Sequence, residues 1–94
     1  MRIVIVGAGE VGTILAKSFL NEQQDVVIID KDPEKIAAIT ELMDVQALVG
    51  HGSHPDILEA AGANKCNMLL AVTSSDEVNM VACQIAYTIF GVET

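Results

Sequence analysis

The run "RIVIV" (2–6) leads without a break into the glycine-rich stretch "GAGEVG" (7–12), and this junction most constrains the fold. A run rich in β-branched residues is typical of a strand that a parallel sheet buries on both faces. The stretch that follows has the spacing G-x-G-x-x-G, and apolar residues at helical spacing begin inside it with Val11, Ile14 and Leu15. A strand that turns directly into a helix at such a motif predicts a βαβ unit.

The same alternation recurs, so the chain is predicted to contain four strand–helix units. Right-handed crossovers then give a parallel sheet of order 3-2-1-4 with helices on both faces, a doubly wound, Rossmann-like α/β fold that stops after its fourth unit. Strand four is therefore a predicted open edge. The predicted strands are 2–6, 25–30, 45–49 and 68–72. The first predicted helix begins near Glu10, and the second runs from 33 to 43. The third runs from Pro55 to a stop at Gly62, and the last ends at about Phe90, before Gly91.

Two of the helices begin at residues that suit an N-cap. Asp32 precedes Pro33 at the first helical position, where the missing N–H of proline is no loss. Ser74 is followed three residues later by Glu77, which satisfies the capping-box pattern, so Ser74 is the predicted N-cap of the last helix.

Composition restricts the function classes. The 94 residues fit one domain (1–94), and 13 acids against 5 bases give a net charge of -8, which disfavours nucleic acid as a partner. No uninterrupted apolar run reaches the length of a membrane span, so a cytoplasmic location is expected. Cys66 and Cys83 are predicted to be reduced thiols in or near the core.

The glycine motif predicts a site for a dinucleotide. Gly7 would allow the tight turn, Gly9 would let the backbone approach a pyrophosphate, and Gly12 would let the helix pack closely on the sheet. The pyrophosphate would bind free backbone N–H groups at the positive end of the helix dipole. Asp30 ends the second strand 18 residues after Gly12, where an acid hydrogen-bonds the adenosine ribose and favours NAD(H) over NADP(H). Lys31 leaves NADP(H) open, because a neighbouring cation can accept a 2′-phosphate. The blander interpretation is a tight turn without a ligand.

Further candidates lie at the same carboxyl edge of the sheet. His51 is predicted to border an adenine ring and His54 to cap the third helix, and their spacing without a third ligand disfavours a metal site. Thr73 is predicted to contact the ribose or the phosphates, whereas ligand contact and helix capping are equally open for Ser74. No nucleophile and base stand in a recognisable catalytic pattern, so no catalytic residues are assigned.

The last helix, 76–90, is apolar on two opposite sides. Val78, Val81, Ala82, Ile85 and Ile89 form one stripe, and Met80, Cys83, Tyr87 and Phe90 form a second. One stripe suffices to cover the sheet, so the second predicts a homo-oligomer contact or a contact with a part of a longer chain.

Together with the glycine turn, the stretches "IIDKDP", "GHGSHPDILEAAGA" and "MLLAVTSSDEVNMVACQIAYTIF" resemble the RCK or KTN family, the N-terminal nucleotide-binding domains of Trk-type potassium uptake regulators. The resemblance covers essentially the whole chain. By position it implies that residues Gly7, Ala8, Gly9, Glu10 and Val11 cradle phosphates, that Asp30 holds the ribose, and that Thr73 and Ser74 line the far side of the ligand.

The family resemblance also implies a function. A cytoplasmic NAD(H)-binding domain, peripheral at the inner face of the membrane, would control a membrane potassium transporter subunit without consuming its cofactor, and would be part of a longer chain. ATP or ADP is the alternative ligand in the same cleft. The competing hypotheses are the cofactor-binding half of an NAD-dependent dehydrogenase and a scaffold that has lost its ligand. At the position of His51 many relatives have Asp.

Overall fold

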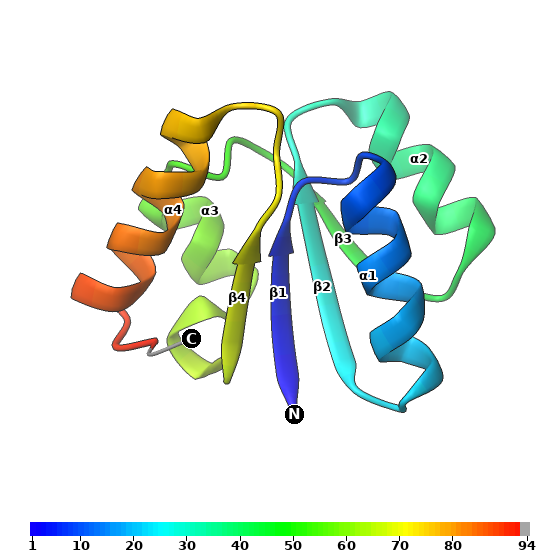
Figure 1. Cartoon of the computed structure of the whole chain (residues 1–94), viewed down its shortest axis with the longest axis horizontal. Helices are drawn as coiled ribbons and strands as arrows, with labels where there is room; N and C mark the ends of the chain where they lie inside the picture. The colour runs from blue at the N-terminus through cyan, green and yellow to red at the C-terminus, as the bar shows by residue number, and fades with distance from the viewer. Residues whose placement is uncertain (93–94) are drawn as a thin grey trace.

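A computed structural model describes residues 1–92 and contains four strands flanked by helices (Figure 1). Residues 93 and 94 of the predicted domain lie outside this range. The strands are β1 (Arg2–Val6), β2 (Asp25–Asp30), β3 (Gln46–Val49) and β4 (Met68–Ala71). The helices are α1 (Glu10–Asn21), α2 (Pro33–Leu42), α3 (Pro55–Ala60) and α4 (Asp76–Thr88), with a short 3-10 helix at Ala63–Lys65.

All strand pairs are parallel, and the order is β3-β2-β1-β4. This confirms the predicted α/β fold and strand order, with β1 in the centre and β4 at one edge. Ile5 is paired with Ile28 on one side and with Leu70 on the other. Strands three and four are each one residue shorter than predicted; the N–H of Val45, for example, donates to the carbonyl of Met43 and not to the neighbouring strand.

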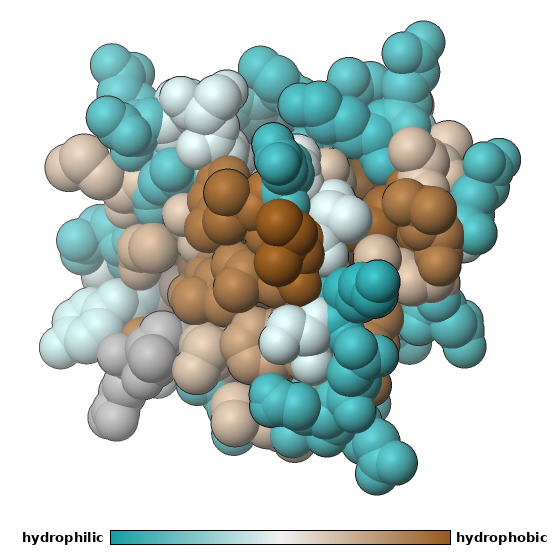
Figure 2. All heavy atoms as spheres, turned by 45° about the vertical axis from the view of Figure 1, so that its right-hand side comes forward, coloured by the Kyte–Doolittle hydropathy of each residue, from teal (hydrophilic) through white to brown (hydrophobic). Residues whose placement is uncertain are grey.

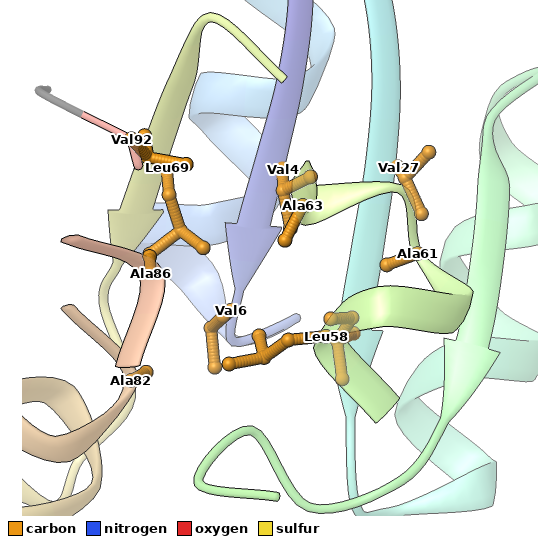
Figure 3. Packing of buried hydrophobic residues seen from close by; sticks show 11 residues of the cluster. Val4, Val6, Val27, Leu58, Ala61, Ala63, Leu69, Ala82, Ala86 and Val92 are labelled. Carbon is orange, nitrogen blue, oxygen red and sulfur yellow. The ribbon is translucent and has the colours of Figure 1, made fainter. Parts of the chain in front are cut away.

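Apolar clusters cover the two faces of the sheet. Alternate residues of β1 point to opposite sides: Val4 and Val6 pack toward α3 and α4, and Ile3 and Ile5 pack toward α1 and α2. Figure 3 shows Val6 beside Leu58 of α3, within the first of these clusters. These side chains are at most 1 % exposed, which explains why the first strand is an unbroken apolar run.

The capping predictions have different outcomes. Asp32 is the N-cap of α2, and its side chain accepts a hydrogen bond from the N–H of Glu34 at 2.9 Å. Gly62 follows α3 with a φ of 89°, the left-handed conformation predicted for it. His54 is at the N-cap position of α3, but its side chain makes no capping hydrogen bond.

The predicted capping box at the start of α4 is wrong. Ser75, not Ser74, is the N-cap, and its hydroxyl accepts from the N–H of Val78 at 3.2 Å. The physical reason lies in the preceding turn, where the Thr73 hydroxyl accepts from the N–H of Ser75 at 3.1 Å and also bonds to Asn79. These bonds hold Ser75 at the first turn, so the N-cap lies one residue later than the capping-box pattern suggests.

The two predicted stripes of α4 are only partly right. Ala82 and Ala86 are buried, Ile85 packs against the core, and Met80 and Tyr87 are 72 % and 66 % exposed. Val81 and Ile89, expected on the sheet side, are exposed.

Phe90 was expected on the outer stripe, but it packs against the core. Gly91, with a φ of 71°, turns the chain so that the N–H of Val92 donates to the carbonyl of Ala86 at 2.9 Å. This turn directs the chain back toward the sheet and brings Phe90 with it.

The two cysteines differ in burial. Cys66 packs against the core, and burial raises the pKa of its thiol, so it is mostly protonated at neutral pH. Cys83 is exposed, which contradicts its predicted place in or near the core. Cys83 directly follows the buried Ala82 on α4 and precedes the buried Ala86 by about one turn, and its side chain faces solvent.

The face of the molecule that carries α1 has an exposed apolar area, which Figure 2 shows in brown at its centre. Right-handed crossovers place α1 and α2 over β1, β2 and β3, so this side of β4 has no helix above it in residues 1–92. On α1, Val11 and Ile14 are exposed. The partly buried side chains packed against the core on this side of the sheet include Leu15, Phe19, Met68, Leu70 and Val72.

Candidate functional site

A cleft of about 360 Å³ opens at the carboxyl edge of the sheet, where the loops after β1, β2, β3 and β4 meet at the upper end of Figure 1. Its size falls within the roughly 300–1,000 Å³ typical of small-molecule sites. Nine predicted site residues line it: Gly7, Gly9, Glu10, Val11, Asp30, Lys31, His51, Thr73 and Ser74. The other two, Ala8 and Gly12, do not line the cleft; they shape the turn behind it.

The first turn of α1 presents unoccupied backbone donors to this cleft. Its N-cap is Gly9, which has no side chain to accept the N–H groups of the following residues. The neighbouring helices α2 and α4 are capped by Asp32 and Ser75. An uncapped helix N-terminus combines free N–H groups with the positive end of the dipole, so it suits an anion such as a phosphate.

Gly9 and Gly12 have different structural roles. A Cβ at Gly12 would lie 1.8 Å from the carbonyl oxygen of Gly7, so this glycine is required by the close packing of helix and turn. A Cβ at Gly9 would meet nothing within 4 Å. Space in front of Gly9 is therefore open for a ligand to approach the backbone.

The carboxylate of Asp30 joins two loops at the cleft. One oxygen accepts the N–H of Ala8 at 2.8 Å, and the other accepts the N–H of Asp32 at 2.9 Å. A carboxylate oxygen has further lone-pair capacity, so both oxygens can still accept a hydroxyl of a ribose. Asp30 thus supports the glycine turn in addition to the ribose-binding role predicted for it.

The charged residues that line the cleft carry both signs. Lys31 and Lys35 are positive, and Glu10 and Asp30 are negative. The formal charge of the lining is therefore balanced although the chain as a whole carries -8, so an anionic ligand meets a less repulsive environment here than elsewhere on the surface.

The ring of His51 is held in place by its neighbours. Its Nδ1 lies 2.6 Å from the hydroxyl of Ser53 and 3.4 Å from the N–H of Ser53, and its ring stacks on that of His54 with centroids 5.0 Å apart. In the contact with the backbone N–H of Ser53, Nδ1 is the acceptor. Among residues 1–92, no three His, Cys, Asp or Glu side chains are arranged to hold a metal.

The wall on the β4 side of the cleft is formed by residues 73–75, and hydrogen bonds fix it. Asn79 bonds to the N–H, the carbonyl and the hydroxyl of Thr73. Thr73, predicted to contact the ligand with its hydroxyl or backbone, therefore has its polar groups already engaged in the loop. Ser74 is exposed and also lines the cleft.

Sequence reasoning missed several lining residues: Val6, Ile29, Lys35, Gly50, Gly52, Val72, Ser75 and Val78. Lys35 and Val78 could have been found, because the first turns of α2 and α4 face the same sheet edge as the glycine motif. Gly52 is different, since a Cβ there would lie 2.2 Å from a Val6 methyl group, a contact between the loop after β3 and strand β1 that no local pattern reveals.

A parallel sheet of order 3-2-1-4 with a cleft beside its central glycine turn defines a Rossmann-like α/β domain. The chain belongs to the TrkA-N domain family, whose model matches residues 3–94. It is 51 % identical, over all 94 residues, to the Trk system potassium uptake protein TrkA of Azorhizobium caulinodans, and 44 % identical over 90 residues to that of Vibrio alginolyticus.

The chain spans about a fifth of the length of these relatives, 20 % in both cases. Solved structures share the fold at low identity. The Shewanella denitrificans Kef CTD in AMP-bound form has a TM-score of 0.84 at 21 % identity, covering 97 % of this chain and 54 % of that one. The Bordetella bronchiseptica enzyme WbmG in complex with NAD has a TM-score of 0.71 at 21 % identity, covering 99 % and 35 %.

Proposed function

We propose that this domain binds NAD(H) and controls a membrane potassium transporter through a ligand-dependent change of conformation, without consuming the ligand. The observation that carries the proposal is the uncapped N-terminus of α1, which opens into the same cleft as the carboxylate of Asp30. Backbone donors for a pyrophosphate and an acceptor for a ribose are the two elements that a dinucleotide requires.

The regulatory part of the proposal is supported by the relatives, which are named Trk system potassium uptake proteins. A ligand that binds two conformations with different affinity shifts their populations, and a partner can sense that shift. We propose that the domain works at the cytoplasmic face of the membrane, bound to its transporter. No helix within residues 1–92 is long and apolar enough to cross a membrane itself.

We further propose that two copies associate through the exposed side of α4, with Met80, Cys83 and Tyr87 in the contact; Phe90 is left out because it packs inward. Sizing experiments on Tyr87→Asp test this surface. Ile14→Asp is the matched control, since it places the same charge on the other apolar area. Loss of a dimer in Tyr87→Asp alone is expected, whereas loss in Ile14→Asp alone would assign the contact to α1 and β4.

Calorimetric titration with NAD, NADH, NADPH, ATP and ADP tests the ligand. We expect NAD species to bind, and the proposal fails if none does. Tight binding of ATP or ADP alone would replace NAD(H) by an adenylate as the ligand. Because Asp30 also supports the glycine turn, the informative result for Asp30→Ala is the ratio of NADPH to NADH affinity, which should rise when the repelling charge is removed. Asp25→Ala is the control, since Asp25 is exposed at the opposite end of β2.

A further inference from the structure

We infer that Asn79 is a positioning residue that ties the 73–75 wall of the cleft to helix α4, so that a ligand touching this wall acts on the helix. The inference rests on the proposed function. Asn79 is in the first turn of α4 and is not among the residues that line the cleft. It would therefore act through Thr73, with no contact to the ligand.

The bonds of Asn79 hold every polar group of Thr73. Its Oδ1 accepts from the Thr73 N–H at 2.9 Å and from the Thr73 hydroxyl at 2.6 Å, and its Nδ2 donates to the Thr73 carbonyl at 3.1 Å. The Thr73 hydroxyl in turn accepts from the N–H of Ser75. One side chain thus satisfies both main-chain groups of Thr73, so the wall cannot rotate unless the start of α4 moves or these bonds break.

The wall also has no space to move toward β1. A Cβ on Gly7 would lie 3.0 Å from the backbone nitrogen of Thr73 and 3.0 Å from the carbonyl carbon of Val72. The turn that is predicted to hold the phosphates and the wall that Asn79 holds are therefore in direct backbone proximity. A ligand that binds in the cleft against both of them can displace the wall only away from β1, and Asn79 would carry that displacement into α4.

Exposed side chains further along α4 connect Asn79 to the surface of the molecule. Met80 is 72 % exposed and Tyr87, two turns further on, is 66 % exposed on the same side of α4. A shift at the start of a rigid helix moves its whole exposed side. The occupancy of the cleft is thereby coupled to the surface that we propose as a subunit contact.

Calorimetry on the 94-residue chain with NAD and with AMP tests the positioning role. Asn79→Ala should bind about tenfold more weakly than wild type, the effect of about 1.4 kcal/mol when supporting hydrogen bonds are removed. Asn67→Ala is the matched control, because Asn67 Oδ1 accepts the N–H of Arg2 at 2.8 Å at the opposite end of the sheet. It should lose stability but not affinity. If wild type does not bind NAD, the proposed NAD(H) function fails; if wild type binds either ligand and Asn79→Ala binds that ligand equally well, the role of Asn79 is overturned.

Amide chemical shifts give a readout that a general loss of stability does not change. In wild type, saturating NAD should shift the amides of 9–12 and those of 80–88; in Asn79→Ala only the first group should shift. Equal shifts along α4 in both proteins would overturn the coupling. If Asn79→Ala does not fold, Asn79→Asp keeps the two acceptor bonds and loses the Nδ2 donor, and its α4 shifts should be reduced; unreduced shifts would again overturn it.

Discussion

The starts of α1 and α4 line the same cleft from opposite sides, yet they are built differently. The N-cap of α1 is Gly9, without a side-chain hydrogen bond, whereas the N-cap of α4 is Ser75, whose hydroxyl occupies the N–H of Val78. Asn79 adds three more bonds on the α4 side. A helix end left open can receive an anion, and a helix end that is capped and bonded to its preceding loop can serve as a fixed wall.

The largest expected effect comes from a substitution at Gly12, behind the uncapped start of α1. Gly12→Ala places a Cβ 1.8 Å from the carbonyl oxygen of Gly7, a backbone contact that cannot relax without moving the turn. Overpacking of this kind should lower the free energy of unfolding by about 3 kcal/mol, or abolish folding. Urea unfolding measures it. An unfolding free energy within about 0.5 kcal/mol of wild type would contradict the close packing of α1 on the turn.

A substitution at Gly9, in front of the same helix start, should lower the affinity for NAD without lowering the unfolding free energy. Gly9→Ala has space for its methyl group, so the unfolding free energy should stay within about 0.5 kcal/mol of wild type. Affinity for NAD should fall about tenfold or more, since the methyl group keeps a pyrophosphate from the N–H groups. Calorimetry and urea unfolding on one preparation check both. Unchanged affinity would mean that no ligand approaches the backbone at Gly9.

The smallest expected effect comes from a substitution at Ser75, the N-cap of α4. Ser75→Ala removes the bond to the Val78 N–H and should cost about 1 kcal/mol of stability, the usual effect of losing an N-cap. Ser74→Ala is the control, because Ser74 was predicted to be the cap but is exposed next to it. Thermal unfolding of the two variants should therefore differ. A larger loss in Ser74→Ala would restore the cap that the sequence pattern predicts.

Much of the fold could be predicted because it depends on local patterns. The apolar runs at 2–6 and 25–30 indicate strands that are buried on both faces of the sheet. Asp32 before Pro33 indicates the N-cap of a helix. The crossover rule then fixes the strand order without any knowledge of distant contacts.

The features that sequence reasoning missed depend on residues that are distant along the chain or on backbone conformation. The bond from the Ala8 N–H to Asp30 spans 22 positions, and that from Thr73 to Asn79 spans 6. The second of these moves the cap from Ser74 to Ser75. The turn at Gly91 decides the direction of Phe90, which helical spacing alone places on the wrong side.

The uncapped start of α1 has a kinetic consequence, because it provides donors without adding a formal charge to a chain that carries -8. An anionic ligand approaching this chain is repelled at long range, and the repulsion is screened beyond about 8 Å at physiological ionic strength. The association rate of NADH should therefore rise with added salt. In sites built from lysine and arginine clusters, the same addition slows association.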